Sequence, residues 1–140
     1  MRKEAGFTLI EIMVVVVILG ILGALIVPNI LGRTGEARVT AAQSDIRGIG
    51  NALNLYRLDN FNYPSTDQGL EALVSQPGGV PEAKNWNTEG YLPKLPKDPW
   101  GNNYLYISPG THGPYDLYSQ GADGKDGGED NAKDILSWEL

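Results

Sequence analysis

The sequence predicts an α+β protein in which one long N-terminal helix packs on a small antiparallel β-sheet. Up to about residue 60 the chain is first apolar and then amphipathic, with the residue spacing of a helix. The remainder is rich in Gly, Pro, Asn and Asp and has only short apolar runs, which is typical of short strands joined by turns. With 140 residues and no cysteine, the chain has a modest core and no disulfide to stabilise it.

Residues 7–27 form an apolar segment that is long enough to cross a membrane. About 21 residues at 1.5 Å per residue span the roughly 30 Å of a hydrocarbon core. The alternative is a secretory signal peptide, but its apolar region is only about 7–15 residues long and is followed by a small-x-small cleavage site. The basic Arg2 and Lys3 in residues 1–6 place the N-terminus in the cytoplasm and the rest of the chain outside it.

Residues 28–60 continue this segment as an amphipathic helix. Pro28 removes one backbone hydrogen bond and permits a kink, but we expect one helix from Phe7 to about Asp59. Its second half then packs on a globular domain formed by residues 61–140. Apolar side chains recur three or four positions apart at Val39, Ala42, Ile46, Ile49, Leu53 and Tyr56.

The globular domain is expected to contain little regular structure. Its predicted elements are a short helix near Gln68–Ser75, a loop through Pro77–Leu95 and antiparallel strands over 103–107, 115–119 and about 135–139. Trp86, Trp100 and Trp138 lie beside turn residues, and we interpret them as core or loop anchors.

Glu11 is unexpected inside an apolar helix. An acidic side chain near the bilayer centre costs about 2.5–3.5 kcal/mol, so Glu11 requires a partner or a role. The alternative is that Glu11 lies close enough to the start of the helix to reach the lipid headgroups. The residues themselves leave both interpretations open.

The segment Gly6-Phe7-Thr8-Leu9-Ile10-Glu11 follows a short basic leader and precedes an unbroken apolar helix. This arrangement resembles the class III signal of type IV pilins and pseudopilins. The resemblance implies that a prepilin peptidase cleaves between Gly6 and Phe7 and N-methylates Phe7. Glu11 would then be the fifth residue of the mature chain and pair with the terminal amine of a neighbouring subunit during assembly.

Further motifs are similar to the major pseudopilins of type II secretion systems. They are Leu58-Asp59-Asn60, Tyr63-Pro64-Ser65-Thr66-Asp67-Gln68-Gly69-Leu70-Glu71-Ala72-Leu73, Leu95-Pro96-Lys97-Asp98-Pro99-Trp100-Gly101-Asn102, Ser108-Pro109-Gly110 and Gly121-Ala122-Asp123-Gly124. The resemblance implies a type IV pilin-like fold and a structural subunit that polymerises into a periplasmic filament. It also implies an inner-membrane location and four partners besides other copies: the peptidase, minor pseudopilins, an assembly platform and a secretin.

Residues 120–134 form an acidic, glycine-rich loop. Hard oxygen ligands at flexible spacing suit calcium, but Lys125 breaks the EF-hand pattern, and a solvated acidic loop is the alternative. The family resemblance implies one bound Ca²⁺. The ligands it implies are Asp123 and Asp134, the carbonyls of Gln120 and Lys125, and one further group among Glu129, Asp130 and Asn131.

Other functions are poorly supported by the sequence. The net charge is −6 and no basic patch stands out, so nucleic acid is not an expected partner. His112 is the only histidine, and its Gly/Pro-rich surroundings predict a surface turn rather than a catalytic base, so no enzyme is expected. Two alternatives to the filament subunit of type II secretion remain: a type IV pilin of a surface filament, and a membrane-tethered binding domain that never polymerises.

Overall fold

The structure is a computed structural model, and it describes Lys3 and residues 5–140, except for the side chains of residues 26–32. Two compact units divide within the first helix: an N-terminal unit, Met1–Glu36, and a C-terminal unit, Ala37–Leu140. The helices and strands in chain order are α1 (Leu9–Asn60), η1 (Leu70–Leu73), β1 (Leu105–Ile107), β2 (Asp116–Ser119), η2 (Gly121–Asp123), η3 (Asp130–Ala132), β3 (Ile135–Leu136) and η4 (Ser137–Glu139).

The helix α1 confirms the prediction of one long helix and begins two residues later than expected. The Thr8 hydroxyl accepts a hydrogen bond from the Glu11 backbone N–H at 3.3 Å, and the Glu11 carboxylate accepts one from the Thr8 N–H at 3.5 Å. This reciprocal pair is a capping box, which fixes Thr8 as the residue before the first turn. The Thr-x-x-Glu spacing is the sequence signal that marks this start of the helix.

The N-terminal unit leaves its apolar side chains uncovered. The large apolar residues of positions 7–25 are between 49% and 80% exposed. No helix within the described residues is both long enough and apolar enough to cross a membrane. The predicted membrane segment, residues 7–27, extends past Leu25 into side chains that lie outside the described residues.

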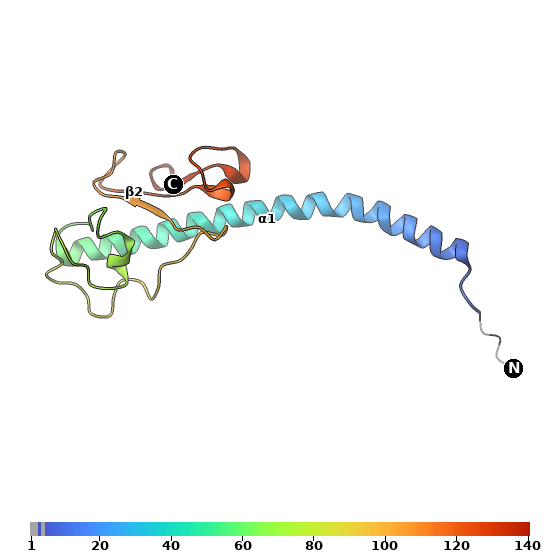
Figure 1. Cartoon of the computed structure of the whole chain (residues 1–140), viewed down its shortest axis with the longest axis horizontal. Helices are drawn as coiled ribbons and strands as arrows, with labels where there is room; N and C mark the ends of the chain where they lie inside the picture. The colour runs from blue at the N-terminus through green and yellow to red at the C-terminus, as the bar shows by residue number, and fades with distance from the viewer. Residues whose placement is uncertain (1–2, 4) are drawn as a thin grey trace. The chain divides into compact units, whose positions relative to one another are not determined.

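The core of the C-terminal unit lies between α1 and the sheet, and Figure 1 shows β2 running beside the second half of the helix. The predicted apolar face of α1 is confirmed, because five of its six residues are buried and Val39 packs against them. Trp86 and Trp100 also pack against this core, whereas Trp138 stacks on His112. The buried apolar residues are Ala42, Ile46, Ile49, Ala52, Leu53, Tyr56, Leu70, Ala72, Leu73, Ala83, Tyr104, Leu117 and Ile135.

The predicted antiparallel sheet is confirmed, with the strand order β1-β2-β3, but its strands are shorter than expected. The registers pair Tyr106 with Leu117 and Ser119 with Ile135. The prediction of a strand up to residue 139 is wrong, because β3 ends at Leu136 and residues 137–139 form η4. The Ser137 side chain accepts the hydrogen bond from the Leu117 N–H at 3.2 Å, so a hydroxyl replaces the next backbone partner.

The other two predicted strands also begin late. Asn103 forms an isolated bridge with Lys97, so β1 starts at Leu105, and β2 starts at Asp116.

The short helix predicted near Gln68–Ser75 is a single 3₁₀ turn, η1. Carbonyl groups of η1 accept hydrogen bonds from the following loop, so they are not available to continue the helix. The Trp86 indole donates to the Ala72 carbonyl at 2.8 Å, and the Tyr91 and Leu92 N–H groups donate to the Leu73 carbonyl. The predicted loop through Pro77–Leu95 contains no helix or strand and is thereby anchored to the core.

Candidate functional site

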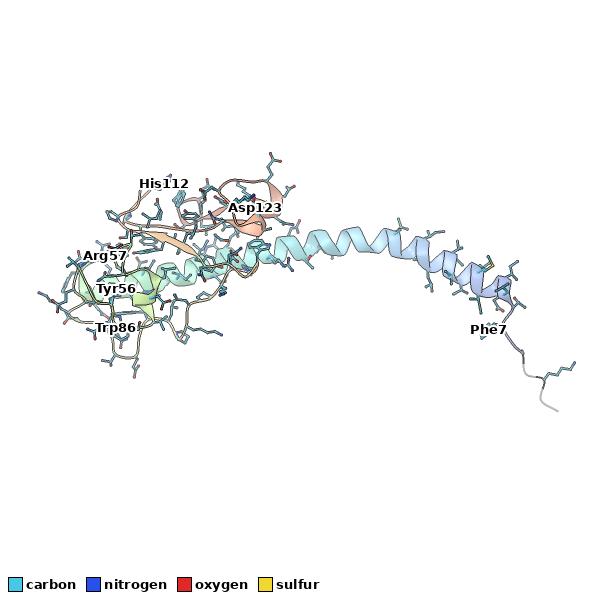
Figure 2. The ribbon with its side chains drawn as sticks, viewed as in Figure 1. Phe7, Tyr56, Arg57, Trp86, His112 and Asp123 are labelled. Atoms are coloured by element: carbon cyan, nitrogen blue, oxygen red, sulfur yellow. The ribbon has the colours of Figure 1, made fainter. Side chains whose placement is uncertain are left out.

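The predicted processing site lies just before α1. Phe7 is 80% exposed, and Figure 2 shows it at the start of the helix. A Cβ atom built on Gly6 meets no described atom within 4 Å. The fold therefore places no steric requirement for glycine at this position, so a requirement for Gly6 has to come from outside the chain.

Glu11, the predicted assembly residue, is engaged with Thr8 in the capping box. The bond from the Thr8 N–H, at 3.5 Å, lies at the long limit for a hydrogen bond. The carboxylate is on an exposed turn of the helix and no described cation pairs with it. Glu11 thus has a local role in starting the helix, and its carboxylate is exposed.

The acidic loop, residues 120–134, is closed on itself by glycines. At Gly121, with φ at +66°, a Cβ would lie 2.7 Å from the Lys133 carbonyl oxygen. At Gly128, with φ at +96°, a Cβ would collide with the Ala132 carbonyl. The approach at Gly121 brings the two ends of the loop together, and the approach at Gly128 folds the middle of the loop onto Ala132. The 3₁₀ turns η2 and η3 contact one another as a result.

Asp134 is the most distinctive residue of this loop. Its Oδ2 accepts a hydrogen bond from the Gly127 N–H at 3.1 Å. Its Oδ1 is buried and has no hydrogen-bond partner among the described residues. A buried carboxylate oxygen without a partner is costly, so this atom is suited to a cation.

The structure brings only some of the other predicted ligands together. Asp123, labelled in Figure 2, accepts from the Lys125 N–H at 3.0 Å, and the Gln120 amide donates to Asp126 at 2.8 Å. Asp130 lines a small open pocket together with Asp134, and Asn131 is exposed. Among the described residues, no three carboxylate or histidine side chains gather in a group that could hold a metal.

Two residues that the sequence analysis did not single out position the start of the loop. The buried Asp98 accepts hydrogen bonds from the Trp100 and Asn102 N–H groups at 3.1 and 2.8 Å. Its other oxygen accepts from the Ser119 hydroxyl at 2.8 Å, and Ser119 accepts from the Gly121 N–H. The Asp-Pro-x-Gly turn signature within residues 98–101 was the available signal for Asp98.

Asp116 organises the turn that contains His112. This buried carboxylate accepts bonds from the N–H and hydroxyl of Thr111 and from the N–H of His112, and it lies 3.2 Å from the His112 Nδ1. Burial raises the pKa of Asp116, but these hydrogen bonds outweigh burial and lower its pKa to about 2. The His112 ring also stacks on Trp138, with ring centroids 4.0 Å apart. His112 is thus part of a surface turn, as predicted, and fastens the C-terminal residues to it.

Replacing Asp116 with Asn is expected to lower the free energy of unfolding by about 1–3 kcal/mol at neutral pH, because the donors of Thr111 and His112 lose a buried, charged acceptor. The folded-state pKa lies below the ordinary value, so this stabilisation is present above about pH 4 and is lost as the pH falls through about 2. Thermal unfolding of the full chain in detergent at pH 6, 4 and 2 measures it. A difference between the two chains that stays constant down to pH 2 would contradict the assignment.

Comparison with known proteins identifies the family. Residues 29–138 match the family described as Type II secretion system (T2SS), protein G, and residues 1–27 match the prokaryotic N-terminal methylation motif. The chain belongs to the type II secretion system protein G family. It is 64% identical over 138 residues to the core protein G of Pseudomonas aeruginosa, covering 99% of this chain and 97% of that protein.

Other relatives and a solved structure agree with this family. The core protein G of Vibrio cholerae is 54% identical over 140 residues, covering 100% of this chain and 95% of that protein. The crystal structure of the major pseudopilin from the type 2 secretion system of enterohaemorrhagic Escherichia coli matches with a TM-score of 0.71 at 42% identity. That match covers 81% of this chain and 96% of the other. The predicted pilin-like fold is confirmed, and membership of this structural family confirms that the chain is not an enzyme.

Proposed function

We propose that this chain is the repeating structural subunit of a pseudopilus, the periplasmic filament of a type II secretion system that promotes export of folded proteins through the outer membrane. One observation carries the proposal. A single helix leads from the N-terminal methylation motif into the unit that matches the protein G family, and its large apolar side chains at residues 7–25 are uncovered. Such a surface requires lipid or other copies of the chain to cover it.

The methylation motif supports a specific order of events. A prepilin peptidase removes residues 1–6 on the cytoplasmic side and methylates Phe7, while the chain is held in the inner membrane with its C-terminal unit in the periplasm. Copies then leave the membrane and join the filament. The partners of this step are other copies, the minor pseudopilins, the inner-membrane assembly platform and the secretin.

In this proposal Glu11 pairs with the methylated amine of Phe7 in a neighbouring copy. The structure offers a competing local role, because Glu11 also caps α1 through Thr8. A carboxylate that leaves water is stabilised by an opposite charge more than by a neutral cap. The charge of Glu11, rather than its capping, is therefore the property that assembly uses.

Glu11→Gln separates these two roles, because glutamine keeps the capping box but removes the charge. We expect normal membrane insertion and a loss of filaments of at least about tenfold, equal to that of Glu11→Ala. Thr8→Ala is the matched control, since it weakens the cap by about 0.5–2 kcal/mol and keeps the charge. Counting filaments by electron microscopy shows whether assembly needs the charge of Glu11 or its capping role. If Glu11→Gln assembled as the unmodified chain does and Thr8→Ala did not, capping would explain the role of Glu11.

We further propose that the acidic loop binds one Ca²⁺. The unpartnered, buried Oδ1 of Asp134 and the carbonyl groups of a glycine-rich loop suit a hard cation. Asp134 and Asp123 would supply carboxylate oxygens and Gln120 and Lys125 carbonyl oxygens, with one of Glu129, Asp130 and Asn131 completing the set. The ion would neutralise part of the loop's charge and fasten residues 120–134 to β2 and β3, which a cysteine-free chain cannot do with a disulfide.

Deleting the chain in its host tests the function as a whole. Export of the host's type II substrates should stop and should return when the chain is supplied again. Re-expression of a chain that lacks residues 7–25 is the control, because it keeps the C-terminal unit without the surface that would assemble. Restored export by that truncated chain would contradict the proposal that filament assembly is the function.

A further inference from the structure

The strand β1 forms one edge of the sheet, and its backbone is unpaired at Tyr106. Within the described residues β1 has β2 as its one neighbouring strand. The register sets Tyr106 opposite Leu117, whose N–H points away from β1 because it donates to the Ser137 hydroxyl. Tyr106 and Leu117 therefore form a non-hydrogen-bonded pair, in which the backbone groups of each residue face away from the other strand.

A second set of hydrogen bonds gives the same orientation for Tyr106. Ser108 turns its backbone outward to Thr66: its N–H donates to the Thr66 hydroxyl at 2.9 Å, and its carbonyl accepts from the Thr66 N–H at 3.3 Å. Backbone groups two residues apart on a strand point the same way, so the Tyr106 N–H and carbonyl also face outward. Neither of these two groups has a hydrogen-bond partner among the described residues.

The chain itself occupies the fourth-strand position on both sides of this gap. Thr66 binds the backbone of Ser108 in the manner of a strand residue, and Lys97 forms an isolated antiparallel bridge with Asn103. The stretch of β1 around Tyr106 is left open between these two contacts. Because Thr66 and Lys97 close its ends, the gap excludes a long strand of another sheet and admits a short extended segment.

An open groove lies beside this unpaired stretch. We call it the β1 groove; it is lined by residues 69–71, 95–97 and 103–106. Most of the lining side chains are apolar or aromatic, and the two charged ones, Glu71 and Lys97, are exposed and opposite in sign. The groove thus carries no net formal charge and attracts neither an acidic nor a basic segment.

The unpaired groups of Tyr106 identify the occupant by its chemistry. They are one donor and one acceptor at the spacing of a β-ladder, and an extended peptide backbone presents the complementary pair. The side chain of the residue opposite Tyr106 would enter the groove beside Leu95. The side chains of its two neighbours would lie on the other face of the sheet, beside Leu105 and the 41% exposed Ile107.

We propose that the β1 groove binds a short, extended and uncharged peptide segment of another protein, which pairs with the backbone of Tyr106 and fills the gap in the fourth-strand position. The residue of that segment opposite Tyr106 is apolar. The inference goes beyond the proposed function and does not rest on it, because every contact that carries it lies within the C-terminal unit.

A titration of the full, isotope-labelled chain in detergent tests the pairing by nuclear magnetic resonance. The probe is acetyl-TTVTT-amide, an uncharged peptide with valine at its centre. We expect the Tyr106 amide signal to move downfield as its N–H gains an acceptor, with half-saturation at or below about 1 mM peptide. The matched control is the same peptide with an N-methyl group on valine, which keeps every side chain and removes the donor for the Tyr106 carbonyl. It should bind at least about tenfold more weakly.

Two further peptides test the stated chemistry of the occupant. Replacing the central valine with lysine or with aspartate should weaken binding at least about tenfold in each case, because the charge would lose water among apolar side chains. Binding of either charged peptide as tight as that of the valine peptide would mean that Glu71 or Lys97 selects a charged partner, and would refute the uncharged segment.

The remaining outcomes also decide the proposal. An unchanged Tyr106 signal at about 1 mM valine peptide, or equal binding of its N-methylated form, would overturn it and leave the edge of β1 to solvent. A Tyr106 signal that shifts when the chain alone is diluted would show that a second copy fills the groove, and would overturn it as well. Filament formation enters none of these measurements, so their failure would leave the proposed function untouched.

Discussion

A chain carrying Gly6→Ala is expected to insert in the membrane and keep its leader attached. The structure gives the reason for expecting a pure processing defect, because a methyl group at Gly6 meets no described atom within 4 Å. The change therefore leaves the fold intact and acts only where the peptidase must accommodate an extended, flexible residue. Processing should fall from nearly complete to undetectable, and filaments should disappear with it.

Mass spectrometry of the membrane fraction measures this directly, because removal of the leader and methylation of Phe7 each change the mass. Ala5→Ser is the matched control, since it alters the neighbouring position and should be processed normally. Recovery of a chain that begins with methylated Phe7 in ordinary yield from the Gly6→Ala variant would place the cleavage site elsewhere.

Removal of calcium is expected to lower the melting temperature of the C-terminal unit clearly. A ligand that binds only the folded state stabilises it by about 2.7 kcal/mol at one hundred times its dissociation constant. For a unit of roughly 100 residues, each kcal/mol corresponds to about 4–8 °C. Millimolar Ca²⁺ should therefore raise the melting temperature above that in EGTA, and Mg²⁺ should substitute poorly because it requires tighter octahedral geometry.

The variant that defines this effect is Asp134→Ala, which removes the unpartnered Oδ1. It should abolish most of the difference between Ca²⁺ and EGTA, as should Asp123→Ala. Asp67→Ala removes an exposed carboxylate from another loop and should keep the full difference. A folded chain whose melting temperature does not change on chelation would make residues 120–134 a solvated acidic loop.

The elements that the sequence predicted well are those specified by local periodicity. The buried face of α1 follows from the spacing of Ala42, Ile46 and Leu53, and the sheet follows from short apolar runs between turns. The end of β3 and the single turn of η1 were not predicted, because side chains from distant parts of the sequence determine them. The Ser137 hydroxyl accepts a hydrogen bond from the Leu117 N–H, and the Trp86 indole donates one to the Ala72 carbonyl.

The candidate site also has a part that local sequence specifies and a part that distant contacts determine. Gly6, Phe7 and Glu11 could be predicted because they lie in one short stretch of sequence, residues 6–11, and the prokaryotic N-terminal methylation motif matches residues 1–27. The ligands of the loop are harder to predict, because Gly121 brings the ends of the loop together and Asp98 holds its start from a separate segment. Spacing along the chain does not reveal which oxygens such a closure brings together, and the ligand set between Lys125 and Asp134 stays a prediction.

Electron microscopy of cells that overexpress the chain together with its secretion system shows whether the chain forms the pseudopilus. We expect thin filaments that antibodies against the C-terminal unit label along their whole length. The filaments should become scarce in EGTA and at least about tenfold fewer with Glu11→Gln. A chain that is processed at Gly6, inserted and folded, yet forms no labelled filament while export proceeds, would contradict the conclusion that it is the repeating subunit of the pseudopilus.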